Sequence, residues 1–254
     1  MRVDAGGTTA GLLQADREAM ADTGFIDELI AEMRERRMSI ADSPVVERVA
    51  RGAMTRQELL GWALQFFPVI SAIPKVMQAI HDRAAADGRR FLKAVVDEEA
   101  GGTESGTKSH PELFLEFVER LGYAPDAVAR AEPPREAAEY LAFRWGAIDT
   151  LPWYLNLVPN VMGEGEIPRA YRPIIEGFQR HYGLTREDLR FFVVHEEVDQ
   201  HHFDAVAGLL AAHAVTDADR REATRIFWET AKLFRRVWDG YASVPPHLAG
   251  ARVQ

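Results

Sequence analysis

The chain has 254 residues, of which 47% are hydrophobic and 27% charged, so it can form one large globular domain or two small ones. Its formal charge of −9, without any run of basic residues, argues against a nucleic-acid partner. There are no cysteines, which excludes disulfides, thiolate metal ligands and cysteine nucleophiles.

The ends of the chain carry no targeting signal that we can identify. No apolar run approaches the roughly 18 residues of a membrane helix, and residues 1–22 lack the basic start and apolar stretch of a secretory signal. We therefore expect a cytoplasmic protein without a membrane partner. Residues 1–22 should form a flexible N-terminal tail and 243–254 a C-terminal tail, with a single helical domain over residues 23–242.

Helical periodicity runs through nearly all of that domain, whereas alternating strand patterns with hairpin turns are absent. Ser43 followed by Pro44 is typical of an N-cap and the first turn of a helix. Thr55 and Glu58 have the spacing of a capping box, which predicts the start of a long apolar helix. Helices should also end at Gly122 and Gly183.

These signals predict an all-α bundle of about seven to eight helices. The short connections between them favour one domain over two. The expected helices cover, in chain order, residues 25–38, 44–50, a long stretch from 55 kinked by prolines 68 and 74, 89–100, 110–121, 135–162 bent by prolines 152 and 159, 168–182, a helix around 195 capped by residues 185–188, and 217–238.

The segment from Phe191 to His202 carries the strongest chemical signal. On a helix, the spacings of four and three residues place His195, Asp199 and His202 on one face, together with the apolar residues of the segment. Ionisable groups are rarely buried without a partner that compensates their lost hydration. Two core histidines bonded to one aspartate would satisfy this, but a bound cation explains all three residues better. The remaining charged residues of the segment are expected to face solvent.

Two further segments carry groups that could complete a metal site. In the first, Glu98 or Glu99 precedes a glycine-rich stretch, and His110 follows it at the expected start of a helix. In the second, Glu164 lies between two glycines and Glu166 follows the second of them, just before Ile167 and Pro168, a pattern that is ordinarily a loop. Acids in such places are usually solvated, so each segment is a weak signal by itself.

Four segments of the chain, taken in order, resemble the heme-oxygenase-like di-iron oxidases and oxygenases, which are relatives of thiaminase-II-like proteins. The segments are a Glu, then His-x-x-Leu-Phe, then Glu-Gly-x-x-Pro, then Phe-Phe-x-x-His-x-x-x-Asp-x-x-His, and the resemblance covers about residues 55–240. The resemblance implies a heme-oxygenase-like helical bundle and assembly as a homodimer. It also implies two Fe(II) ions held by Glu99, His110, Glu164, His195, Asp199 and His202. Glu98 remains an alternative to Glu99, and Glu166 to Glu164. Ser71 stands where some members carry a further carboxylate.

The implied chemistry is the oxidation of a small molecule with O2 as co-substrate, through a peroxo-level di-iron intermediate. Three carboxylates and three neutral imidazoles suit two ferrous ions and leave a mildly cationic site, which would attract a carboxylate-bearing, amino-acid-like or fatty-acid-like metabolite. Members of this family often serve specialised biosynthesis. No catalytic residue beyond the metal ligands is expected. The alternatives are a metal-independent oxidase or thiaminase-like hydrolase on the same fold, and a non-catalytic helical interaction protein.

Two expectations concern the surroundings of this site. Residues 100–109 contain three glycines, so their ordering is costly, and we expect this segment to be mobile without metal. Substrate-pocket walls are expected from Phe66, Phe67, Trp145, Trp153 and Tyr154, although core packing also explains them. Arginines and lysines that could bind a substrate carboxylate are expected to be surface charges; these are Arg144, Lys232, Arg235 and Arg236.

Overall fold

The computed structural model describes residues 23–244, except for the side chains of residues 197–202. Over this range the chain forms ten α-helices and two short 3-10 helices, and residues 23–244 contain no strand. The all-α prediction is therefore confirmed. The helix number exceeds the expected seven to eight because short helices occur between the long ones. The predicted tail at residues 1–22, and most of the one at the other end, lie outside the described residues.

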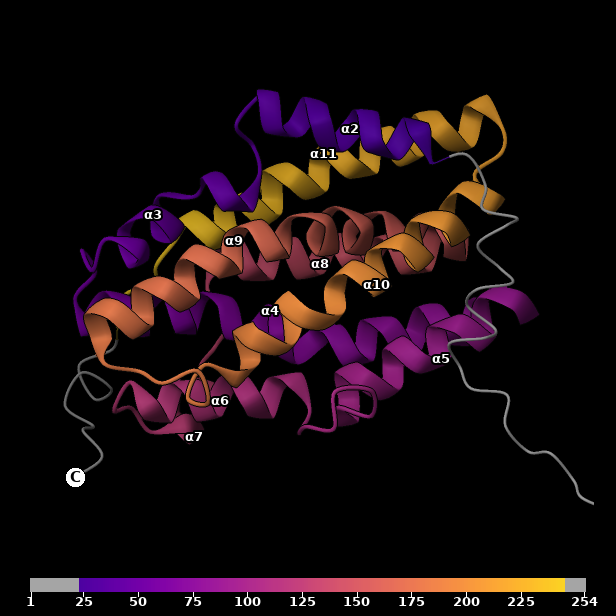
Figure 1. The fold of residues 1–254 in the computed structure, drawn as a ribbon. Coiled ribbons are helices and arrows are strands. Elements are labelled where there is room, and N and C mark those ends of the chain that lie inside the picture. Colours follow the sequence, from indigo (N-terminus) through magenta and orange to yellow (C-terminus); the bar gives the residue numbers. More distant parts are fainter. Residues whose placement is uncertain (1–22, 245–254) are drawn as a thin grey trace, which may run out of the picture.

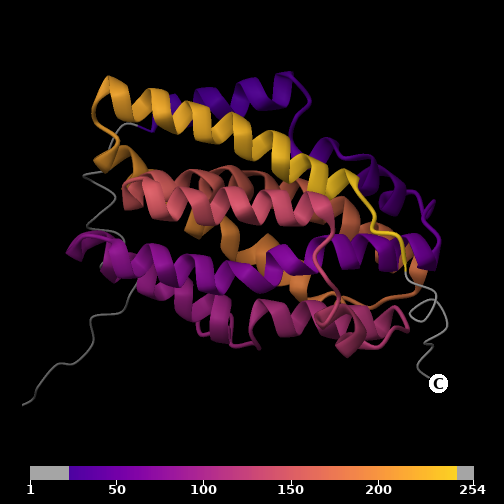
Figure 2. The same cartoon turned by 180° about the vertical axis from the view of Figure 1, so that it is seen from behind.

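The helices lie in three tiers (Figures 1 and 2). Helices α2 (Gly24–Glu35) and α11 (Asp217–Asp239) lie along one side, with α3 (Pro44–Ala50) beyond the end of α2. Helices α8 (Arg135–Thr150) and α9 (Val158–Tyr182) form the middle tier, and α10 (Arg190–His213) crosses α9. On the other side lie α4 (Arg56–Arg83), α5 (Ala86–Gly101), α6 (His110–Arg120) and α7 (Pro125–Ala129).

Side-chain caps begin several helices where the sequence predicts them. The Ser43 hydroxyl accepts from the Val45 N–H at 3.2 Å, which starts α3 with Pro44 in its first turn. Thr55 and Glu58 form the expected capping box of α4. The 3-10 helix η2 (Ile40–Asp42) begins at a similar cap, Ser39. Thr185 and Asp188 also exchange capping bonds, but α10 itself begins only at Arg190, after an intervening turn.

Helix α4 is the apolar centre of the bundle, and both Pro68 and Pro74 lie inside it. Contrary to the expectation from sequence, it is long and apolar enough to cross a membrane by length and composition alone. However, 72% of its most apolar 18-residue window is buried against other helices. Trp62, for example, stacks on Phe66 and Phe192 at ring-centroid distances of 5.5 and 6.3 Å. The apolar character of α4 is thus accounted for by packing within the protein.

The largest departure from the predicted elements is around residues 151–168. The expected helix 135–162 ends at Thr150, because Pro152 disfavours helical geometry at Leu151, whose ψ of 157° is extended. A 3-10 helix η3 (Trp153–Leu157) follows and leads into α9. The predicted loop at 163–168 is also wrong, since this stretch lies inside α9. Packing of α9 against α10 and α3 outweighs the local preference of its glycines and of Pro168.

Candidate metal centre

His195 lies on α10 with its imidazole buried among the aromatic residues of the core. Its side chain is 8% exposed, and its ring centroid is 4.6 Å from that of Phe191. The Nδ1 atom lies 2.7 Å from the Phe191 carbonyl oxygen. A carbonyl only accepts, so Nδ1 carries the hydrogen and the lone pair of the neutral ring is on Nε2. The backbone of α10 thus fixes the tautomer and leaves Nε2 as the ligand atom.

His110 reaches the same place from α6. Ser109 caps this helix through a capping box with Glu112, which makes His110 its first residue. The buried imidazole lies with its ring centroid 4.3 Å from that of His195. Two imidazoles from helices far apart in the sequence are therefore adjacent in the core.

Two consecutive glutamates at the end of α5 face the two nitrogens of the His110 ring. Glu99 Oε2 lies 2.9 Å from Nδ1, and Glu98 Oε1 lies 3.3 Å from Nε2. The other oxygen of Glu98 accepts from the backbone N–H groups of Glu104 at 2.7 Å and Ser105 at 3.1 Å. Burial by itself would raise the pKa of Glu98, but the hydrogen bonds from His110, Ser105 and Glu104 outweigh it and lower the pKa to about 2. Glu98 is thus a fully buried carboxylate that is already well satisfied.

Glu99, His110 and His195 together have the geometry of a cation site. One ligand atom from each lies within 4.8 Å of the others. The 2.9 Å between Glu99 and His110 is close to the ~3 Å expected for two neighbouring ligands with bonds of about 2.1 Å. The structure therefore brings together three of the six predicted ligands.

Glu164, the fourth predicted ligand, projects from the middle of α9 into the buried core. It is 9% exposed, and its Oε2 atom has no hydrogen-bond partner among the described residues. Burial, followed by the negative charge of Glu99, raises the pKa of Glu164 to about 8, against smaller opposing effects of its bond with Asn160 and of the positive charge of Arg144. An orphaned buried carboxylate oxygen beside a second carboxylate fits a cation that is bound between them.

Glu166, the alternative to Glu164, is engaged elsewhere. Its fully buried carboxylate accepts from Arg34 Nε at 2.6 Å, from Arg169 at 2.6 Å and from the Ser39 hydroxyl. These bonds connect α9 to α2 and to the cap of η2, and they satisfy both oxygens of the Glu166 carboxylate. This arrangement supports Glu164 over Glu166 as the candidate ligand.

The remaining predicted ligands, Asp199 and His202, have side chains outside the described residues, and their role stays a prediction. The backbone of α10 is helical without a break from residue 190 to 213, as the predicted spacing requires. Glu196 lies next to His195 and pairs with Arg172 at 3.2 Å and Arg186 at 3.8 Å, which agrees with its expected place toward solvent.

The aromatic residues proposed as pocket walls do not form one group. Phe66 and Phe67 pack around Phe114 in the core. Trp145 is 38% exposed, whereas Trp153 and Tyr154 pack against His213. His213 lies 18 residues beyond His195 on the same helix, which is about 27 Å away at 1.5 Å per residue. Those last two side chains therefore belong to the far end of the bundle.

Arg144 was expected at the surface, but it is only 3% exposed. Its Nη2 donates to Asn160 Oδ1 at 2.9 Å, and its Nη1 donates to the Tyr140 hydroxyl at 3.2 Å. Asn160 in turn bonds with Glu164. The aromatic composition around Arg144 did not reveal this role. The i,i+4 spacing of Tyr140 and Arg144 was the one local signal for it.

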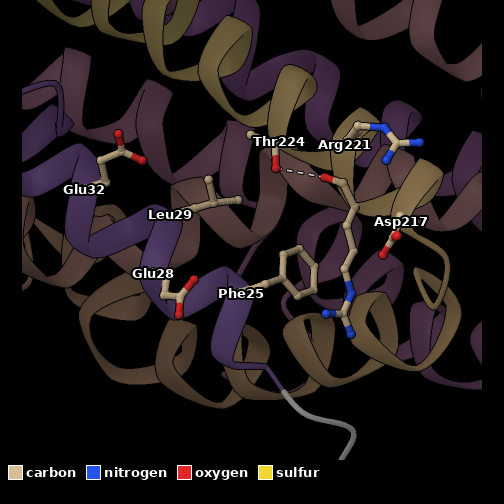
Figure 3. A pocket seen from close by; sticks show the side chains of 8 residues that line it. Phe25, Glu28, Leu29, Glu32, Asp217, Arg221 and Thr224 are labelled. Atoms are coloured by element: carbon tan, nitrogen blue, oxygen red, sulfur yellow. Dashed lines mark hydrogen bonds between the residues drawn. The ribbon is translucent and has the colours of Figure 1, made fainter.

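A surface pocket of about 430 Å³ lies apart from this cluster, between α2 and α11 (Figure 3). Three acidic side chains and two arginines surround an apolar base of Phe25 and Leu29. None of the candidate ligands lines it, and its charges do not converge on one point. We therefore place the functional site at the buried Glu–His cluster.

An all-α fold with a buried cluster of imidazoles and carboxylates defines a class of helical metalloprotein. Residues 60–235 match the profile of a family described as iron-containing redox enzymes, and the chain belongs to this family. The resemblance noted in the sequence is thereby confirmed.

Curated relatives carry one name, 4-aminobenzoate synthase. The protein of Chlamydia trachomatis is 28% identical over 200 residues, which cover 77% of this chain and 83% of that one. The protein of Nitrosomonas europaea is 27% identical over 184 residues, or 67% of this chain and 72% of that one.

Solved structures agree on the fold. A domain of unknown function with a heme oxygenase-like fold from Shewanella denitrificans superimposes with a TM-score of 0.71 at 18% identity, over 84% of this chain and 89% of that one. A TenA homolog from Pseudomonas syringae gives 0.74 at 8% identity, over 88% and 93%. The predicted heme-oxygenase-like bundle is therefore confirmed.

Proposed function

We propose that this iron-containing redox enzyme is an oxygen-dependent, non-heme di-iron oxidase or oxygenase that acts on a small carboxylate-bearing metabolite. The observation that supports this best is the convergence of Glu99, His110 and His195 within 4.8 Å, in the buried core of a chain of this family. The unpaired Oε2 of Glu164 adds a fourth donor.

The proposed ligands of two ferrous ions are the six predicted ones: Glu99, His110, Glu164, His195, Asp199 and His202. Nitrogen and oxygen donors of this kind suit Fe(II), whereas the chain has no cysteine to supply sulfur. When bound, the ferrous pair would supply electrons to O2 and so activate it for oxidation of the substrate.

The chain's own residues orient these donors and control their protons. The Phe191 carbonyl holds His195 in one tautomer, and the carboxylate of Glu98 supports His110 from the far side of its ring. Glu164 keeps its proton near neutral pH when no metal is bound, because burial raises its pKa to about 8. Metal binding therefore has to displace this proton.

Two arguments support the proposed substrate class: the net charge of the iron site and the name of the curated relatives. Two ferrous ions with three carboxylate ligands leave a net positive site, which favours an anionic substrate. The relatives are named as synthases of 4-aminobenzoate, so an aromatic carboxylate is the product that their name gives. We propose a small carboxylate as the substrate of this chain, with 4-aminobenzoate as a candidate product and compounds that could give rise to it among the first to test.

Iron stoichiometry after anaerobic loading with Fe(II) tests the proposal. We expect about two iron ions per chain in the wild type, and a loss of one or both in His110→Ala and His195→Ala. His181→Ala serves as the control, because this exposed histidine lies on α9 outside the cluster. Mixing the loaded protein with O2 and candidate carboxylates should then give an absorbance transient that one compound accelerates.

A wild type that binds no more iron than His195→Ala would refute the di-iron proposal. Turnover that persists in rigorously iron-free protein would favour the metal-independent oxidase or hydrolase instead.

A further inference from the structure

The side chain of Arg144 is a buried cation that makes no ion pair within 4.0 Å among the described residues, although its charge acts on Glu164 from farther away. It is 3% exposed, and its two hydrogen-bond partners, Tyr140 and Asn160, are neutral. A guanidinium has five N–H donors, of which these bonds use two. Burying an unpaired charge is costly, so a buried arginine is ordinarily paired with an anion. No ion pair within 4.0 Å therefore balances the charge of Arg144 in the described part of the chain.

The surroundings hold the guanidinium in a fixed position. Tyr140 is 2% exposed, and its ring stacks on Phe234 with centroids 5.1 Å apart, so its hydroxyl cannot move freely. Arg144 can only donate, so the Asn160 amide must present its oxygen to Arg144. Its NH2 group is then the one that bonds with Glu164. Arg144, Asn160 and Glu164 thus form a directed chain that leads to the metal cluster.

Glu164 does not take the place of the missing anion. The positive charge of Arg144 lowers the pKa of Glu164, but it is the smallest of the effects on that pKa, and no ion pair joins the two within 4.0 Å in the described part of the chain, because Asn160 lies between them. Under the proposed function the carboxylate of Glu164 is also committed to metal. A cation next to a metal site opposes metal binding by electrostatic repulsion, so metal binding does not explain the position of Arg144.

We propose that Arg144 is the receptor for the carboxylate of the substrate, and that it holds this carboxylate away from the iron ions. The proposal rests on the proposed function and makes it more specific. Arg is well suited to the task because its planar fork matches the two oxygens of a carboxylate.

The position of Arg144 also restricts the substrate. Its partner Asn160 precedes Glu164 by four residues on α9, which is one helical turn, or about 5–6 Å between their Cβ atoms. A carboxylate bound at Arg144 therefore lies about one turn away from a ligand of the metal. The oxidised atom should then be several bonds from the carboxylate, as in an arene carboxylate or an extended amino acid. Substrates that react at the carbon next to the carboxylate fit this geometry poorly.

Binding of matched acids and amides tests the proposal without turnover. The probes are benzoate, phenylacetate and hexanoate, each compared with its neutral amide, and calorimetry measures their affinity for iron-loaded protein without O2 and for iron-free protein. We expect the wild type to prefer acids in both forms. Arg144→Met should reduce acid affinity by about 10- to 100-fold and leave amide affinity unchanged. Arg144→Lys should fall between the two, since it keeps the charge but loses the fork.

Arg135→Met is the matched control, because Arg135 lies on the same helix at its exposed start. It should bind every probe as the wild type does. Circular dichroism checks that each variant folds, and if Arg144→Met does not, the Arg144→Lys comparison decides the question.

Two outcomes of the binding experiment would overturn the proposal. One is that acids bind no better than amides, and the other is that Arg144→Met weakens the binding of both equally. A loss of iron with intact acid preference would assign Arg144 to the positioning of Glu164 instead. A wild type that prefers acids but binds no iron would refute the di-iron function and leave the carboxylate site standing.

Discussion

Glu98 and Glu99 are consecutive residues with different functions. They approach opposite edges of one imidazole, but only Glu99 belongs to the three-residue cluster with His195. Glu98 instead connects His110 to the backbone N–H groups of the following loop. A carboxylate behind a metal-bound histidine orients the ring and raises its basicity. Glu98 is therefore a positioning residue in our interpretation.

Replacing Glu98 and Glu99 in separate variants distinguishes the positioning role of Glu98 from the proposed metal-binding role of Glu99. Glu98→Gln keeps the shape but loses the charge, and we expect iron to bind about 10- to 100-fold more weakly with the stoichiometry of two retained at high iron. Glu99→Gln should lose one iron at any concentration. Glu119→Gln, an exposed change on α6, is the control. Titration with Fe(II) under anaerobic conditions measures all three. Wild-type affinity in Glu98→Gln would contradict the assigned role.

Glu164 predicts an unusual pH dependence in iron-free protein. Its folded-state pKa of about 8 lies above the ordinary value of 4.5, so the folded state keeps a proton that the unfolded state has released. Stability from this residue is present below pH 4.5 and declines as the pH rises toward 8, by at most about 1.4 kcal/mol per pH unit. Glu164→Gln should remove this slope. Glu176→Gln, at an exposed site of α9, should retain it.

Urea unfolding between pH 5 and 8, in the presence of a chelator, measures the effect. The same slope in Glu164→Gln and wild type would show that Glu164 is not the source.

At the scale of single elements, the loop between α5 and α6 has a glycine-rich backbone, but hydrogen bonds hold part of it in place. Gly102 ends α5 with φ of +58°, and a Cβ there would lie 2.5 Å from the Thr107 carbonyl oxygen. The Glu98 carboxylate binds the next part of the loop without any metal. The sequence predicted mobility for residues 100–109, and the structure identifies where that loop is held.

Hydrogen exchange should resolve the two parts of this loop. In iron-free protein we expect slow exchange at the amides of Glu104 and Ser105, which donate to Glu98, and faster exchange at Gly106 and Lys108. Iron should slow the faster ones, because it fixes His110 and Glu99 at the two ends of the loop. Equal protection with and without iron would contradict the coupling of this loop to the metal. In Glu98→Gln, protection at 104 and 105 should fall.

Two glycines of α9 should respond oppositely to the same substitution. A Cβ at Gly177 would lie 2.4 Å from the Val49 carbonyl oxygen, where α9 packs against α3. At Gly163 a Cβ meets nothing within 4 Å among the described residues. We expect Gly163→Ala to stabilise the protein by about 0.5–1 kcal/mol through helix propensity, and Gly177→Ala to destabilise it by about 1–3 kcal/mol through overpacking. Chemical denaturation measures both, and equal signs would refute the argument.

At the scale of the whole molecule, the sequence correctly predicted those features that depend on neighbouring residues in the chain. Caps such as Thr55 with Glu58 and the helical periodicity gave the all-α class, and the spacing of His195 within its helix gave one part of the site. The helix around Glu164 was misjudged because glycines and Pro168 favour a loop locally, whereas the packing of α9 is a property of the complete bundle. The burial of Arg144 was missed for the same reason, since it depends on Asn160 from another helix.

The candidate ligands join parts of the bundle that lie in different tiers. Glu99 and His110 come from α5 and α6, while Glu164 and His195 come from α9 and α10. A metal ion bound among them therefore connects these helices, and it binds the folded chain alone. Ligand at 100 times its dissociation constant stabilises a protein by about 2.7 kcal/mol. For a chain of this size, that should raise the Tm by roughly 5–10 °C.

We expect this shift with Fe(II) without O2, and with Co(II), which avoids oxidation during heating. His195→Ala should lose most of it, because the three-residue cluster is then incomplete, while His181→Ala should keep it. Differential scanning calorimetry at several metal concentrations measures the shift, which for specific binding rises with the logarithm of the metal concentration. Weak surface binding would give the same shift in both variants. An identical shift in His195→Ala and wild type would mean that the metal stabilises the bundle from some other place.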